Sequence, residues 1–201
     1  MNEKTQDKVT SRLEAFSDGV LAIIITVMVL ELKAPHGTDW VAIKPVISEL
    51  ISYIMSFLFV GVYWGNHHHL LHLVKKLPAS IMLANLHLLF WLSLVPFATG
   101  WMGENNFAPF TVATYAVLLN VCGIAYMVLQ KTIESAHKDD DELKQLMKKQ
   151  TSKEIFSLAS YASAIPLAYL NSYISIAIFF GVAIMWLVPD KELLGKDNWS
   201  E

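Results

Sequence analysis

Residues 13–32 read LEAFSDGVLAIIITVMVLEL, an apolar stretch whose only charged residues are carboxylates. A bilayer core of roughly 30 Å takes about 20 residues of α-helix to cross, and this stretch has that length. With 54% hydrophobic and 16% charged residues, the 201-residue chain is too apolar for an ordinary soluble domain. Five further apolar stretches follow, at Trp40–Trp64, Ala79–Trp101, Phe110–Gln130 and the shorter Ile155–Leu170 and Tyr173–Val188, the last two separated by a tight turn at Asn171 and Ser172. The sequence therefore predicts an all-α polytopic membrane protein, with residues 1–201 forming one domain of six transmembrane helices.

The basic residues predict how the six helices are oriented. Cytoplasmic loops of membrane proteins collect Lys and Arg, and an even number of spans places both termini on the same side. Only Lys33 and Lys44 fall on the opposite side. The side with the termini holds Lys4, Lys8, Arg12, Lys75, Lys76, Lys131, Lys138, Lys144, Lys148, Lys149, Lys153, Lys191 and Lys196. Both termini are therefore expected in the cytoplasm, with Asp18 near the cytoplasmic face and Leu30 toward the outside.

The longest polar segment is Glu134–Glu154, rich in Lys, Asp and Glu. We expect it to extend the fourth and fifth helices into the cytoplasm, and a regulatory role stays open. Its run of three Asp residues lacks the alternating ligands, the Gly and the terminal Glu of a calcium loop. The chain shows no nucleophile–base–acid set and no phosphate-binding loop, so we expect neither an enzyme nor a cofactor.

A cluster of four His residues, His67, His68, His69 and His72, ends the second predicted helix. Two of them, His68 and His72, are four residues apart and could share a helix face as metal ligands. No Asp, Glu or Cys lies near them in the sequence, so interfacial packing or a hydrogen bond to the first helix is the favoured interpretation, and no metal site is predicted.

Polar side chains inside apolar helices need partners, because an unsatisfied polar group in hydrocarbon costs several kcal/mol. For Glu49, Asn85, His87 and Asn120 the default expectation is a bond to another helix. Asp18 lies inside the first helix, where Ser17, Arg12, a His of the second helix or another chain is expected to satisfy it. Whether Asp18 is a structural brace or contacts a solute stays open at this point.

The first helix also has a distinctive stripe. At about 100° per residue, Arg12, Gly19, Ile23, Thr26 and Leu30 fall on one narrow face, with Phe16 and Val27 at its margin. Such a face is usually a helix-packing surface. The same face arranged around a symmetry axis would form a narrow apolar pore.

The segment Arg12–Pro35, RLEAFSDGVLAIIITVMVLELKAP, resembles the first helix of the bacterial branch of the transmembrane protein 175 family of potassium channels. The resemblance is based on Arg12, the Phe16-Ser17-Asp18-Gly19 motif, Ala22-Ile23, Thr26 and the Leu-rich end before Pro35. Chain length, the six-span layout and the Trp64 and His-rich end of the second helix agree with it. That family lacks the backbone-carbonyl filter loop of ordinary potassium channels, and no TVGYG-like run is visible in this sequence either.

The resemblance implies a homotetramer in the plasma membrane, in which four copies of the first helix line the pore. It implies that Ile23 forms the narrowest ring, with Thr26, Val27 and Leu30 lining the path outward. Family members often have Leu at the position of Val27, so the ring there is expected to be wider. It also implies that the Phe16-Ser17-Asp18-Gly19 motif joins Arg12, His68 and His69 in a network that orients the helix.

These features predict a channel with modest selectivity for potassium over sodium, because potassium is less strongly hydrated and loses less at an aliphatic ring. Expected partners are further copies of the chain, the lipid bilayer and monovalent cations, with no nucleic acid and no cofactor besides the permeant K⁺. The alternatives are a secondary or proton-coupled transporter that uses Asp18 and His residues as a relay, and a membrane scaffold without conduction.

Overall fold

The computed structural model describes residues 3–44, 46–74, 76–138 and 140–188, and within these ranges the regular structure is entirely α-helical. Lys75, Lys191 and Lys196 and the C-terminal end lie outside the described residues, so the predicted cytoplasmic C-terminus stays a prediction. The elements are α1 (Glu3–Leu30), α2 (Trp40–Ile43), α3 (Val46–His72), α4 (Ala79–Leu92), α5 (Val95–Glu104), α6 (Pro109–Ala136), α7 (Asp141–Leu170) and α8 (Ser172–Leu187).

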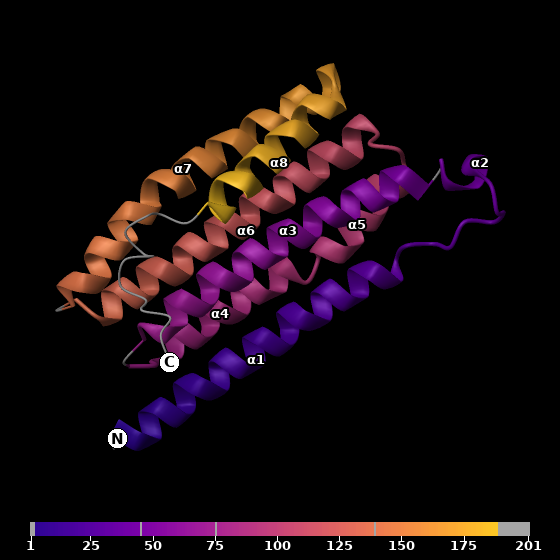
Figure 1. The fold of residues 1–201 in the computed structure, drawn as a ribbon. Coiled ribbons are helices and arrows are strands. Elements are labelled where there is room, and N and C mark those ends of the chain that lie inside the picture. The colour runs from indigo at the N-terminus through magenta and orange to yellow at the C-terminus, as the bar shows by residue number, and fades with distance from the viewer. Residues whose placement is uncertain (1–2, 45, 75, 139, 189–201) are drawn as a thin grey trace.

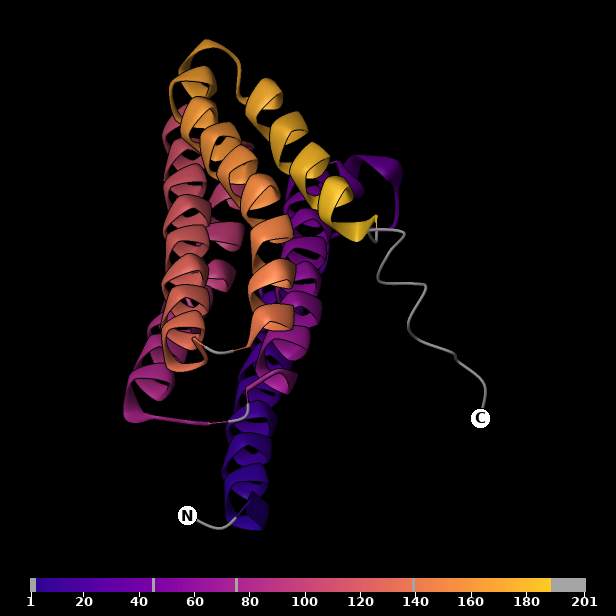
Figure 2. The same cartoon turned by 90° about the vertical axis from the view of Figure 1, so that its left-hand side faces the viewer.

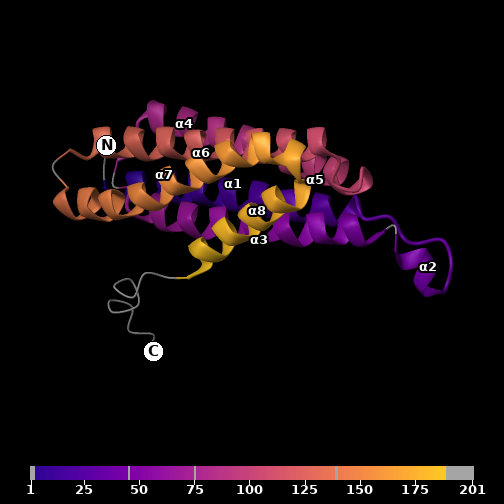
Figure 3. The ribbon, with the colours of Figure 1, turned by 90° about the horizontal axis from the view of Figure 1, so that it is seen from above.

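The long helices run side by side in an elongated bundle (Figure 1). Helix α1 lies along one edge and packs against α3, α4 and α5, whereas α7 and α8 form the opposite edge and pack against α6 and α3. The N-terminal end of α1 projects beyond the other helices (Figure 2). The short α2 stands apart at the far end (Figure 3).

Four segments are long and apolar enough to cross a membrane, namely Val9–Leu30, Val46–His72, Ala79–Glu104 and Pro109–Ala136. Helix α8 is apolar but shorter. Helix α7 joins a charged first half to an apolar second half. The structure thus has several apolar membrane helices, as predicted, while the count of six spans remains an expectation.

The second predicted span begins later than expected. Residues Trp40–Ile43 form the separate α2, and the long helix starts at Val46. Asp39 fixes where α2 starts, because its side chain accepts a hydrogen bond from the Ala42 amide at 3.0 Å and so caps α2.

The third predicted span, Ala79–Trp101, is two helices and not one. Helix α4 ends at Leu92, and α5 starts at Val95 after a turn at Ser93 and Leu94. The cause is Pro96, which has no N–H to donate to the carbonyl of Leu92 and whose ring would clash with that carbonyl in a continuous helix. Between α7 and α8 the predicted tight turn is present. The Asn171 side chain accepts a hydrogen bond from the Tyr173 amide at 2.9 Å and caps α8.

Most of the polar segment Glu134–Glu154 is helical, because α6 continues to Ala136 and α7 begins at Asp141. Asp140 caps α7 by accepting from the Leu143 amide at 3.1 Å. Its location in the cytoplasm remains a prediction.

The contact between α3 and α5 depends on a glycine. A Cβ added to Gly103 would lie 2.7 Å from the Cα of Glu49 and 3.2 Å from the Ser52 hydroxyl oxygen. A backbone atom cannot move aside as a flexible side chain can, so the two helices approach this closely only because residue 103 has no side chain.

We expect Gly103→Ala to lower the stability of the protein by about 1–3 kcal/mol through overpacking. Thermal unfolding of the detergent-purified protein would measure the loss. Gly61→Ala in α3 is the matched control, because a Cβ there would meet nothing within 4 Å and alanine is the better helix former by up to about 1 kcal/mol. A Gly103→Ala protein as stable as the Gly61→Ala protein would contradict the packing argument.

Candidate functional site

Helix α1 has one face that packs into the bundle. Its buried residues are Leu13, Ser17, Leu21, Ile24 and Met28, which recur at intervals of three or four. This is the spacing of one helix face, and it rests on α3, α4 and α5.

The opposite face of α1 is exposed and coincides with the stripe predicted from the sequence. Ile23 is 62% exposed and Leu30 is 79% exposed, in contrast to 4% for Ile24. The other residues of the stripe, Arg12, Phe16, Gly19, Thr26 and Val27, are exposed as well. A single chain therefore leaves this whole face uncovered.

Thr26 is the hydroxyl residue of the exposed face. Its Oγ1 donates to the backbone carbonyl of Ile23 at 2.9 Å. A hydroxyl has one donor hydrogen and two acceptor lone pairs. With the hydrogen committed to the backbone, the oxygen keeps acceptor capacity of the kind that a cation uses.

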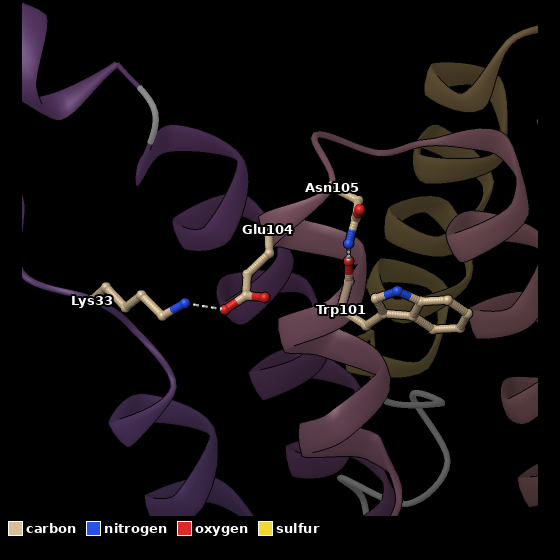
Figure 4. A network of polar contacts seen from close by, with 4 residues as sticks. All are labelled: Lys33, Trp101, Glu104 and Asn105. Atoms are coloured by element: carbon tan, nitrogen blue, oxygen red, sulfur yellow. Dashed lines mark hydrogen bonds and ion pairs between the residues drawn. The ribbon is translucent and has the colours of Figure 1, made fainter.

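A groove of about 600 Å³ runs between α1 and α5 beside this face, lined in part by Ile23 and Val27. Two carboxylates, Glu31 and Glu104, contribute to the lining at the end of the groove near the C-terminus of α1. Lys33 pairs with Glu104 there, next to the α5 C-terminal turn in which the Asn105 amide donates to the carbonyl of Trp101 at 2.8 Å (Figure 4). The hydrogen bond from Lys33 to Glu104 and the charges of Glu104, Glu49 and Glu31 raise the pKa of Lys33.

A chain of buried hydrogen bonds joins α1 to α4 and α3. The Asn85 side-chain amide donates to Ser17 Oγ at 2.9 Å, and His67 Nε2 lies 2.6 Å from Asn85 Oδ1. Ser17 Oγ in turn donates to the carbonyl of Leu13 at 2.9 Å. Asn85 and Ser17 are fully buried and His67 is 1% exposed.

Two carboxylates on either side of Ser17 make further contacts with α3. The Trp64 indole N–H donates to Asp18 Oδ1 at 3.0 Å. One helical turn away, Glu14 Oε1 lies 2.8 Å from His68 Nδ1. The sequence expectation for Asp18 named Ser17, Arg12, a His residue or another chain, and the structure gives it Trp64 instead.

The structure brings together only part of the predicted motif network. Ser17, Asp18 and His68 contact neighbouring helices, whereas Phe16 and Gly19 lie on the exposed face. Arg12 makes no polar contact within the described ranges, and the His69 ring lies beside the ring of His68, at 5.8 Å between centroids. Sequence reasoning missed Trp64, Glu14 and the Asn85–His67 pair as partners, although it identified Asn85 as a polar residue that needs another helix.

The His cluster does not form a metal centre in the described part of the chain, where no group of three His, Cys, Asp or Glu residues has a suitable arrangement. His68 instead lies in a stack of rings along α3, with centroids 6.1 Å from Trp64 and 6.2 Å from His72.

Comparisons with known proteins point to one family. Residues 12–96 match the family model described as "Endosomal/lysosomal potassium channel TMEM175". A potassium channel of Chryseobacterium sp. (strain P1-3) is 48% identical over 182 residues, which cover 90% of this chain and 94% of that protein. The crystal structure of a lysosomal potassium-selective channel TMEM175 homolog from Chamaesiphon minutus matches with a TM-score of 0.76 at 29% identity, covering 90% of this chain and 97% of that chain. The human endosomal/lysosomal proton channel TMEM175 is 29% identical over 129 residues, which cover 62% of this chain and 25% of that protein.

We expect Asn85→Ala to destabilise the protein by about 1–3 kcal/mol, because His67 and Ser17 would each lose a buried hydrogen-bond partner. Thermal unfolding in detergent would measure the effect. Asn120→Ala is the control, since the Asn120 amide bonds only within its own helix, to the Ala116 carbonyl at 3.2 Å. Equal losses of stability in the two variants would show that the hydrogen bonds of Asn85 to His67 and Ser17 do not stabilise the protein more than a bond within one helix.

Proposed function

The chain belongs to the TMEM175 family of potassium channels, and from that premise we propose that it conducts potassium across the plasma membrane as a homotetramer whose four α1 helices line the path. Ile23 forms the constriction, and Thr26, Val27 and Leu30 line the route outward from it. The channel prefers potassium over sodium modestly.

The two unlike faces of α1 are the observation on which the proposal rests. One face is buried against three helices of the same chain, while the other exposes Ile23, Val27 and Leu30 together with the hydroxyl of Thr26. Exposed apolar residues alone suit contact with lipid. A face that also contains Thr26 and starts at Arg12 suits a position around a central axis, where each copy contributes one stripe.

The proposed selectivity follows from dehydration. A ring of Ile23 side chains offers a cation no replacement for its water, so the barrier rises with the free energy of hydration that the ion gives up. Potassium holds its water less tightly than sodium, so its free energy of dehydration at the ring is smaller. Thr26 lies one turn beyond the ring. Its hydroxyl acts as a donor to the Ile23 carbonyl, so the lone pairs of its oxygen stay available to a cation. Thr26 therefore recovers part of the cost of dehydration.

The network around Ser17 and Asp18 acts through orientation. It bonds to α3 and α4 and not to the exposed face, so in this proposal it fixes the rotation of α1 about its own axis. That rotation decides whether Ile23 or Ile24 points toward the axis. Asp18 is thus a positioning residue that needs no contact with the ion.

A second candidate function is proton-coupled transport or proton conduction. Vertebrate relatives are named endosomal/lysosomal proton channels, and the 2.8 Å contact between Glu14 and His68 joins two titratable groups beside α1. Against a relay that starts at Asp18, its partner in this structure is Trp64 and not a His. Uptake that saturates and requires a proton gradient would favour this candidate over the potassium channel.

We expect the purified protein to release potassium from liposomes loaded with KCl, and we expect Ile23→Ala and Ile23→Asn to increase the single-channel conductance severalfold by widening or wetting the ring. Ile24→Ala is the matched control, because Ile24 is 4% exposed and packs inside the chain, so its loss should lower stability and not raise conductance. Unchanged currents in both Ile23 variants would remove Ile23 as the constriction. Absence of flux from the wild type would overturn the channel itself.

We expect Thr26→Val to lower the potassium-to-sodium permeability ratio, because the variant keeps the shape and removes the oxygen. Reversal potentials under bi-ionic conditions would measure the ratio. Thr114→Val in α6 serves as control, since the Thr114 hydroxyl bonds to the Phe110 carbonyl of its own helix and lies outside the proposed path. A ratio that stays constant in Thr26→Val would limit selectivity to the Ile23 ring.

A further inference from the structure

A second cavity lies among α3, α6, α7 and α8. Figure 1 shows α6, α7 and α8 on the opposite side of α3 from α1. The volume of the cavity is about 50 Å³. A cavity needs roughly 10–15 Å³ to hold one water molecule, so this one has room for about three or four atoms of that size. The proposed conduction path does not involve any of its walls, which include Tyr63, Asn66, Tyr126, Glu154, Tyr161 and Trp186.

Glu154 is the charged residue of this cavity, and only 7% of its surface is exposed. Its Oε1 atom is shielded from solvent and has no hydrogen-bond partner. Glu154 forms no ion pair within the described part of the chain. Burial raises the pKa of the Glu154 carboxyl, while hydrogen bonding by Gln130 and the charge of Lys131 lower it. A buried carboxylate with a vacant acceptor is costly unless a cation or a proton neutralises it.

Two of the surrounding aromatic residues, Tyr126 and Trp186, direct their polar groups to other partners. The Tyr126 hydroxyl donates to the backbone carbonyl of Asn66 at 3.2 Å, and the Trp186 indole N–H donates to Ser157 Oγ at 2.9 Å. These residues therefore offer the cavity aromatic rings and no donor for Glu154. Aromatic faces attract cations through the ring quadrupole. The Trp186 ring already shows this preference, because the Lys153 ammonium lies 5.9 Å from its centroid, so a bound ammonium would share this ring with Lys153.

We infer that this cavity is a binding site for a primary ammonium group, held by the Glu154 carboxylate and enclosed by the rings of Tyr63, Tyr126 and Trp186. An ammonium with three N–H donors fills the vacant acceptor of Glu154, and a short alkyl tail of one or two carbons fills the remaining space against the rings. A quaternary ammonium has no N–H to donate and is larger, so the site excludes it.

The position of the cavity relative to the membrane suggests where the ammonium comes from. Glu154 directly precedes the predicted fifth span and Trp186 lies near the end of the sixth, which places the cavity at the expected level of the cytoplasmic lipid headgroups. The same chemistry is available from a phosphatidylethanolamine headgroup and from a small soluble amine, and the experiment separates these two sources.

The first arm compares two cations at constant KCl and constant ionic strength with the purified wild-type protein. Ethylammonium chloride should raise the unfolding temperature saturably by several degrees, because a ligand that binds only the folded state stabilises it, while tetramethylammonium chloride should have no saturable effect. Equal effects of the two salts, or none, would overturn the inference. This comparison needs no variant to fold.

The second arm assigns the effect to Glu154. Glu154→Gln keeps the shape and removes the charge, so the ethylammonium shift should disappear, and Trp186→Leu should weaken binding at least severalfold. Glu134→Gln is the matched control, an exposed carboxylate at the end of α6, and should retain the full shift. A shift that persists in Glu154→Gln would contradict the site.

The third arm identifies the source. The protein is taken from vesicles with equal parts phosphatidylethanolamine and phosphatidylcholine, and the lipids that remain bound are counted by native mass spectrometry. Enrichment of phosphatidylethanolamine in the wild type and its loss in Glu154→Gln support a lipid headgroup as the ligand. Equal retention of both lipids together with a positive ethylammonium shift supports a soluble amine in the same site.

Discussion

The hydrogen-bond chain from His67 through Asn85 to Ser17 is the interaction on which the position of α1 depends. Inside an apolar bundle each of these groups needs a partner, because water is not available to replace a lost one. The Ser17 hydroxyl donates to the Leu13 carbonyl, so its oxygen accepts from the Asn85 amide. The Asn85 oxygen then accepts from His67 Nε2. The direction of every bond follows from the first, and the chain therefore specifies one arrangement of α1, α4 and α3.

A second layer of buried polar contacts joins α3, α5 and α6, and its Thr99 hydroxyl also lies 4.0 Å from Met28 Sδ of α1. Ser56 Oγ lies 2.8 Å from the Tyr115 hydroxyl and 2.7 Å from Thr99 Oγ1, which connects α3 to α6 and α5. Helix α3 takes part in both layers. It packs against α1 as well as against α5 and α8, so it connects the attachment of α1 to the rest of the bundle.

Much of the α1 face was predictable from the sequence, because a helix has a fixed period and Ile23 and Leu30 fall on one side of it whatever surrounds them. The interruption at Pro96 was also encoded locally, although length and apolarity alone suggested one continuous span. The partners were not predictable. Whether Asp18 meets Trp64 or a His depends on how α3 is rotated and how far it is shifted along its axis, and these result from packing over the whole bundle, including the close approach at Gly103.

The attachments of α1 are distributed unevenly along its length. Glu14, Ser17 and Asp18 make polar contacts with α3 and α4. Beyond them, the packing face consists of Leu21, Ile24 and Met28. The polar links there are the long contact of Thr99 Oγ1 with Met28 Sδ at 4.0 Å and, after the end of the helix, the exposed Lys33–Glu104 pair. Apolar side chains slide past one another at the cost of dispersion contacts alone, whereas breaking the Ser17 chain leaves buried groups unpaired. A displacement of the half of α1 that contains Ile23 and Thr26 is therefore cheaper than a displacement of the half that contains Ser17. In the proposed tetramer, a change in the width of the Ile23 ring would therefore move α1 most at its C-terminal half and turn it about the hydrogen-bonded end.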